Sequence, residues 1–165
     1  MRQPIEAVLA RIGEGFFQQA FVVDDIEGAQ TAMTALGCAS FAFLEATPLQ
    51  YRYRGRDVEC SIALAFARSG GVQIELVQPV SGEGIHTEFL TTNGPGAHHL
   101  GFLVDDLDLE LASAADAGFP DVMSGAFGNL RFAYLDTWDA FGAYLELVQD
   151  PDGLMAQLMP WKVSP

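Results

Sequence analysis

The chain has 165 residues, of which 50% are hydrophobic and 18% are charged. This composition is typical of one compact domain, or of two small modules that share a core, and it excludes a disordered chain. Acidic residues outnumber Lys and Arg by 22 to 8, which gives a formal charge of −14. Nucleic acids and anionic membranes are therefore disfavoured as partners, because so few cations cannot neutralise a row of phosphates.

Two cysteines, Cys38 and Cys60, are too few for a disulfide framework, and neither belongs to a Cys-x-x-Cys pair. We interpret both as small buried hydrophobic residues. The first residues show neither a long apolar stretch nor a cleavage pattern, and no stretch approaches the length of a membrane span. We therefore expect a cytoplasmic protein.

The first predicted elements are an N-terminal helical extension over residues 1–16 and a first module over residues 17–80. Apolar residues recur at helical spacing before Gly13, which favours a short helix in the extension. The module opens with a strand and a helix, for which Asp24 or Asp25 serves as N-cap. Three strand-like runs complete it, near residues 39–45, 59–67 and 72–77.

A linker over residues 81–97 is rich in glycine and proline and contains a short helical turn. His86 lies in this linker, and we expect it to be exposed to solvent. The second module, residues 98–150, repeats the order of strand, helix and three strands. A tail over residues 151–165 contains another short helix.

The second module is an internal duplicate of the first. The string Glu-Leu-Val-Gln occurs at Glu75–Gln78 and again at Glu146–Gln149, and each copy closes a segment that opens in a similar way. Positions 18, 23 and 37 correspond to positions 99, 104 and 118 at one constant offset of 81, so no insertion separates them. The sequence therefore predicts an α+β fold in which two tandem βαβββ modules form a curved mixed sheet.

Four polar residues fall on the concave side of this sheet, because side chains alternate between the two faces of a strand. They lie in the first and last strands of the modules and are Gln18, Glu75, His99 and Glu146. Taken singly, each would be interpreted as an exposed or structural residue. If the modules pack edge to edge about a pseudo-twofold axis, however, the four side chains converge. One imidazole, two carboxylates and one amide oxygen suit a divalent metal ion, so we predict a metal-binding cleft.

These motifs resemble the vicinal oxygen chelate superfamily, which includes glyoxalase I, methylmalonyl-CoA epimerase, extradiol dioxygenases and antibiotic-resistance proteins. The likeness covers about residues 17–149. The segment Gly94–Asp106, with its small-residue loop, paired histidines and Val-Asp-Asp end, is most similar to the epimerases. The four predicted ligands are nearer to those of some glyoxalase I enzymes. Extradiol dioxygenases usually present two histidines and one carboxylate to iron, and Gln18 breaks that pattern.

The resemblance implies a metal-dependent isomerase or epimerase that abstracts a proton alpha to a carbonyl or thioester. A divalent ion (zinc, cobalt, nickel, manganese or magnesium) would stabilise the resulting enediolate, and Glu146 would serve both as ligand and as base. An epimerase needs a second acid or base, and approximate alignment assigns this role to Glu59, provided that it faces the cleft. His98 alternates away from His99 and is interpreted as structural.

Two alternatives remain open. One is a glyoxalase I-like lactoylglutathione lyase, and the other is a non-catalytic protein that binds small molecules, as the resistance proteins do. The expected partner is a small carbonyl or thioester substrate, although cations for a CoA pyrophosphate or for glutathione carboxylates are sparse. We expect a homodimer, in which the modules pair either within one chain or across the two chains.

Overall fold

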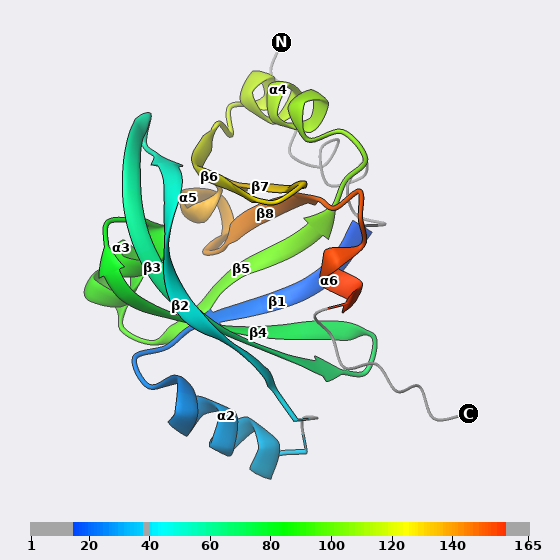
Figure 1. The fold of residues 1–165 in the computed structure, drawn as a ribbon. Coiled ribbons are helices and arrows are strands. Elements are labelled where there is room, and N and C mark those ends of the chain that lie inside the picture. The colour runs from blue at the N-terminus through cyan, green and yellow to red at the C-terminus, as the bar shows by residue number, and fades with distance from the viewer. Residues whose placement is uncertain (1–14, 38–39, 158–165) are drawn as a thin grey trace.

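The computed structural model describes residues 15–37 and 40–157. Within these ranges eight strands close into a barrel, in the order β1-β4-β3-β2-β6-β7-β8-β5. Helices α2 and α4 lie on opposite sides of the barrel (Figure 1). Residues 1–14 of the predicted N-terminal extension and Cys38 lie outside the described residues, while Phe16, the last residue of that predicted extension, belongs to the first strand. The α+β fold of two βαβββ modules is confirmed, with the curvature of the sheet carried to full closure.

The elements of the first module follow the predicted order, and the bounds are β1 (Phe16–Val22), α2 (Ile26–Ala35), β2 (Ala42–Tyr53), β3 (Arg56–Ser69) and β4 (Val72–Gly82). Helix α3 (Ile85–Asn93) connects the modules. The second half comprises β5 (Gly96–Leu103), α4 (Leu107–Ala117), β6 (Asp121–Phe127), β7 (Leu130–Leu135), α5 (Trp138–Phe141), β8 (Tyr144–Gln149) and α6 (Leu154–Gln157).

The two modules pair within one chain. In each module the first strand runs parallel to the last, as β1 does beside β4 and β5 beside β8. The modules then meet twice, where β1 pairs with β5 and β2 pairs with β6, both antiparallel. One chain therefore supplies both halves of the barrel interior.

Both long helices begin at an aspartate. The side chain of Asp25 accepts a hydrogen bond from the Gly28 amide, and that of Asp106 accepts one from the Leu109 amide, each at 3.0 Å. Such a cap satisfies an amide that has no partner within the helix. Helix α4 ends at Gly118, whose φ of 97° is a left-handed conformation that glycine adopts without steric cost. The N-cap of α2 is thus Asp25 rather than Asp24, and the N-cap of α4 is Asp106 rather than Asp105.

The main hydrophobic core lies between the barrel and the two outer helices. Phe21, Val23 and Leu76 pack together with Ile26 of α2, whereas Leu147 packs with Leu107 of α4. These residues alternate with the polar ones of the same strands, so the predicted division of the sheet into two faces is confirmed. Cys60 is also buried, and burial raises the pKa of its thiol to about 11. None of the described helices is long and apolar enough to cross a membrane.

Helix α3 differs from the sequence-based expectation. It spans nine residues rather than a short turn, and it packs against β1, β4 and β5. Ile85, His86 and Phe89 are buried by this packing. The prediction that His86 is exposed was wrong, since only 2% of its surface is accessible. The reason is tertiary, because the helix covers one end of the barrel and points this face inward.

Candidate functional site

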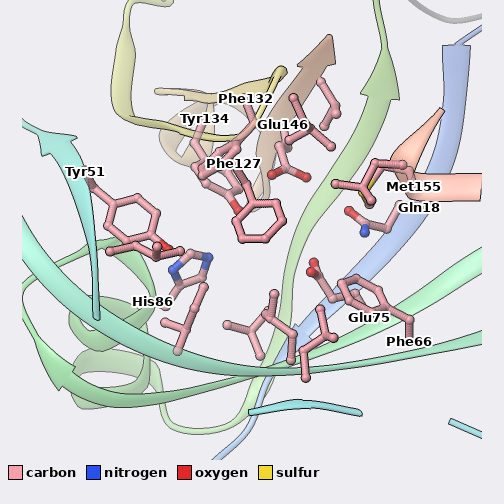
Figure 2. A pocket seen from close by; sticks show the side chains of 18 of the residues that line it. Gln18, Tyr51, Phe66, Glu75, His86, Phe127, Phe132, Tyr134, Glu146 and Met155 are labelled. Atoms are coloured by element: carbon pink, nitrogen blue, oxygen red, sulfur yellow. The ribbon is translucent and has the colours of Figure 1, made fainter. Parts of the chain in front are cut away.

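A cavity of about 210 Å³ lies inside the barrel and is lined by residues from both modules. Figure 2 shows Gln18, Glu75 and Glu146 around this space, with Tyr134 and His86 on its other sides. Most of the remaining lining residues are apolar and come from strands β2, β3, β4, β6, β7 and β8 and from helix α6. The polar side chains therefore gather at one part of an otherwise apolar space.

The strand register explains why these side chains meet. Gln18 on β1 is paired with Gly101 on β5, which is paired in turn with Glu146 on β8. Along the adjacent row, Ala20 lies between Glu75 on β4 and His99 on β5. The pseudo-twofold arrangement thus brings the first and last strands of both modules side by side.

Glu75, His99 and Glu146 form a compact buried cluster. The Nε2 atom of His99 lies 3.1 Å from a carboxylate oxygen of Glu75 and 3.4 Å from one of Glu146. Each residue offers one donor atom such that the three atoms lie within 4.8 Å of one another. The structure therefore brings together three of the four ligands that the sequence predicts, with Gln18 on the lining of the same cavity.

Two buried lone pairs favour a cation at this cluster. Gln18 donates through Nε2 to the side-chain oxygen of Gln73 at 2.6 Å, which leaves its own Oε1 buried and without a hydrogen-bond partner among the described residues. His99 Nε2, although close to both carboxylates, has the geometry of a hydrogen bond to neither. Buried polar atoms normally have partners, so an amide oxygen and an imidazole nitrogen in this state fit a divalent metal ion well.

The Nδ1 atom of His98 lies at hydrogen-bond distance from the Nδ1 atom of His99. The two atoms are 2.9 Å apart, so one nitrogen must carry a proton and the other a lone pair. Where His99 donates this proton, its Nε2 keeps the lone pair that a metal requires. His98 is thus buried against a predicted ligand even though its side chain leaves the strand on the other face.

The charges of the cluster change the proton affinities of its members. Burial alone would lower the pKa of His99, but the nearby carboxylates of Glu146 and Glu75 raise it to about 9. Burial raises the pKa of Glu75, and the charge of Glu146 adds to this effect, while His99 opposes it. In the absence of a metal ion, the two carboxylates therefore favour a proton on His99. A divalent cation would displace this proton and supply the positive charge beside the carboxylates.

Because Gly101 has no side chain, the side chain of Gln18 can occupy the space beside it. A Cβ atom at position 101 would lie 2.7 Å from Oε1 and 2.9 Å from Cβ of Gln18, and 3.1 Å from the Phe17 ring. The second of these contacts is not with the flexible end of the side chain, so rotation of the amide cannot relieve it. The small residue after His-Leu in the second module is therefore required by a side chain from the first.

His86 is the main site residue that the sequence does not reveal. It lines the cavity, and neither of its ring nitrogens has a hydrogen-bond partner among the described residues. Burial, followed by the charge of His99, lowers the pKa of His86 to about 3, so its ring is neutral. The apolar residues at helical spacing around it are the only signal that this helix is buried.

Glu59 is not brought to the cluster. It is exposed on β3, where Gln50 Nε2 donates to its carboxylate at 2.9 Å. On the same strand Ile62, Leu64 and Phe66 line the cavity, so the odd-numbered Glu59 falls on the outer face. The carboxylate that does line the cavity outside the cluster is Glu45, at an irregularity of the β2–β3 pairing between Leu44 and Thr47.

A barrel of paired βαβββ modules with an imidazole and carboxylates at its centre defines the class of protein. The profile of the glyoxalase/bleomycin resistance protein/dioxygenase superfamily matches residues 17–134. The chain belongs to that superfamily, which confirms the resemblance found in the sequence.

Solved structures show the same fold. The methylmalonyl-CoA epimerase from Mycobacterium tuberculosis superposes with a TM-score of 0.61 at 24% identity, covering 86% of this chain and 91% of the epimerase chain. A hypothetical protein from Bacillus halodurans C-125 also gives a TM-score of 0.61, at 19% identity, covering 83% of this chain and 94% of the other. The uncharacterized protein YqjC of Bacillus subtilis strain 168 is 29% identical over 97 residues, which are 55% of this chain and 67% of that protein.

Proposed function

We propose that the protein is a metal-dependent isomerase, of the epimerase kind, that abstracts a proton from the carbon alpha to a carbonyl or thioester. The observation that carries this proposal is the buried cluster of Glu75, His99 and Glu146, whose donor atoms lie within 4.8 Å of one another beside the cavity. The unpartnered oxygen of Gln18 supplies the fourth ligand. The likeness in fold to a methylmalonyl-CoA epimerase supports the same class of reaction.

A bound divalent ion would act as a Lewis acid toward the substrate carbonyl, which makes the alpha proton more acidic. Glu146 takes that proton. Its carboxylate lines the cavity, and it accepts a hydrogen bond from the hydroxyl of Tyr134, whose own pKa is raised mainly by burial. The neutral phenol therefore holds the carboxylate in position without competing as an acid. The apolar walls exclude water from the carbanion that forms.

Inversion at the alpha carbon requires a second group that returns the proton to the opposite face of the substrate. Glu45 fits this role better than Glu59, because Glu45, although also exposed, lines the cavity, whereas Glu59 lies on the outer face of β3. A protein that uses Glu146 alone would return the proton to the same face of the enediolate, either to the original carbon with retention or to the neighbouring carbon, as in a glyoxalase I-like isomerisation. The two carboxylates thus separate the epimerase from its nearest alternative.

Solvent deuterium exchange tests the proposal. The purified protein is analysed for bound metal, and alpha-proton exchange is followed in deuterated water for methylmalonyl-CoA and, in parallel, for the hemithioacetal of methylglyoxal and glutathione. We expect Glu146→Gln to lower exchange by about 10²- to 10⁴-fold, the usual contribution of a general base. Glu45→Gln should suppress inversion more than exchange. A protein that binds no metal, or whose exchange is indifferent to Glu146→Gln, would contradict the proposal.

Glu59→Gln is the matched comparison for these variants. It makes the same chemical change on the outer face of β3, so we expect exchange and inversion to be unaffected. A loss comparable to that of Glu146→Gln would instead restore the role that the sequence alignment assigned to Glu59.

The competing function is non-catalytic binding of a small molecule, which the largely apolar lining of the cavity favours. Binding of an apolar molecule alone gives no reason to bury two carboxylates beside an imidazole nitrogen and an amide oxygen that have no hydrogen-bond partner among the described residues. Metal content is therefore the property that separates the two functions, since simple sequestration of an apolar molecule does not require the ion.

A further inference from the structure

The walls of the cavity indicate which substrates the site accepts. Apart from the polar cluster, the lining is dominated by aliphatic and aromatic side chains, including Leu49, Ile62, Leu64, Phe66, Leu130 and Phe132. Phe127 and Leu44 also line it, and they are 58% and 38% exposed. Large apolar side chains at the accessible part of the cavity favour entry of an apolar molecule.

No Lys or Arg lines the cavity in the part of the chain that the structure describes. Described arginines form ion pairs with acidic side chains at 2.7–3.3 Å, and these pairs include Arg52–Asp57, Arg54–Glu88, Arg56–Glu83 and Arg131–Asp108. A hollow on the outside of β2 and β6 includes Arg52 and Arg131, but each already has its aspartate. A phosphate or a second carboxylate on the substrate would have to displace one of these partners.

The volume limits the part of a substrate that the cavity can enclose. An apolar cavity of about 150 Å³ binds one benzene molecule, so about 210 Å³ admits one ring with a short substituent. The long chain and the nucleotide of a CoA ester would lie outside such a space. The formal charge of −14 also repels a polyanion as it approaches.

We propose that the substrate is an uncharged, mainly apolar carbonyl compound of about the size of one ring, with its carbonyl oxygen directed at the ion that Glu75, His99 and Glu146 would hold. This inference rests on the proposed function for the placement of the carbonyl oxygen. The apolar remainder of the substrate lies against the walls formed by β2, β3, β6 and β7.

Calorimetric binding to the metal-loaded full-length protein tests the substrate class. Acetoin and phenylacetylcarbinol carry the same hydroxyketone unit and differ only by a methyl or a phenyl group, while methylmalonyl-CoA represents the charged thioesters. We expect phenylacetylcarbinol to bind about 10- to 100-fold more tightly than acetoin, because the cavity buries its ring. Methylmalonyl-CoA should bind more weakly than phenylacetylcarbinol.

Leu64→Asn should reduce the preference for the phenyl compound over acetoin at least severalfold. Leu109→Asn is the control, because Leu109 is 58% exposed on α4 and does not line the cavity. It should change neither affinity.

Alpha-proton exchange, measured on the same samples, separates this inference from the proposed function. Tight binding of phenylacetylcarbinol without any exchange would contradict the proposed function and uphold the substrate class. Tighter binding of methylmalonyl-CoA, or equal affinity for acetoin and phenylacetylcarbinol, would overturn the substrate class. Failure of all three compounds to bind would overturn it as well.

Discussion

The two modules use the repeated Glu-Leu-Val-Gln in the same way. The glutamate lines the cavity in both copies and the leucine packs in the core beneath a helix. The glutamine fixes the start of that helix, since Gln78 accepts from the Ile26 amide and Gln149 donates to the Asp105 carbonyl, both at 3.0 Å. The repeat therefore carries both the proposed ligands and the contacts that hold strand and helix in register.

The modules differ in the proposed ligand from the first strand, which is Gln18 in one module and His99 in the other. They also differ in the residue that orients this ligand. Gln18 is oriented by Gln73 from a neighbouring strand, whereas His99 is oriented by His98 from its own strand. Neither support is repeated, and the corresponding positions of the other module are Tyr144 and Phe17. The two modules therefore share one arrangement of strands but differ in the proposed ligands and in the residues that orient them.

The largest expected effect tests whether the two cores are equivalent. Leu76→Ala and Leu147→Ala each remove a fully buried side chain from the corresponding position, so each should destabilise the protein by about 2–5 kcal/mol. Urea unfolding measures both changes, with the exposed Leu109→Ala as control. If one variant costs far less than the other, the core beneath that helix collapses around the cavity and the modules are not equivalent.

The next effect comes from the positions of Gly101 and Ala20, which correspond in the two modules. Gly101→Ala should cost about 1–3 kcal/mol and weaken metal binding, because the new methyl group meets Gln18. Ala20→Gly should cost no more than about 1 kcal/mol, through backbone entropy and lost packing, and should leave the ligands in place. Unfolding and metal titration distinguish them. Normal metal affinity in Gly101→Ala would mean that Gln18 is not a ligand.

The supporting residues should differ in importance. His98→Leu should reduce metal affinity by about 10- to 100-fold, the usual cost of losing a hydrogen bond that orients a ligand, because it leaves the protonation state of His99 Nδ1 unfixed. Gln73→Leu should cost less, since Gln18 can still turn its neutral oxygen toward the ion by rotation of the terminal amide, with no change of protonation state. Competition with a coloured chelator measures both. The reverse order would show that Gln18 is the ligand that limits affinity.

The repeated features were the ones that the sequence could predict. The pairings of β1 with β4 and of β5 with β8 each keep one register, and the predicted inward faces of Gln18, Glu75, His99 and Glu146 agree with the structure. The prediction for Glu59 depended instead on the register of a longer hairpin, whose pairing shifts between Leu44 and Thr47. Contacts between the strands decide where such a shift occurs. The pattern of polar and apolar residues along the sequence does not reveal it.

His86 was beyond prediction for another reason. It belongs to α3, which connects the two modules, and its burial depends on the packing of α3 against β1, β4 and β5. Helical spacing can indicate which residues share a face, but it cannot show what that face will meet. The residues outside the duplication are therefore those whose roles require the structure.

The smallest expected effect is a change in stability with pH that results from the burial of His86 on α3. The pKa of buried His86 is about 3 in the folded protein against an ordinary value of 6.5. Between these values the unfolded chain binds a proton that the folded protein does not, so stability falls as the pH decreases below 6.5. The limiting slope for one such group is about 1.4 kcal/mol per pH unit.

His86→Leu removes this group and keeps an apolar side chain at the position. Urea unfolding at pH 7 and pH 5, with a chelator present, should show that the variant loses about 1–2 kcal/mol less stability than the wild type. His99, whose raised pKa acts in the opposite direction, is common to both proteins and cancels from the difference. An equal loss in the two proteins would mean that His86 is not buried in its neutral form, and that α3 does not close the barrel as tightly as the repeated strands do.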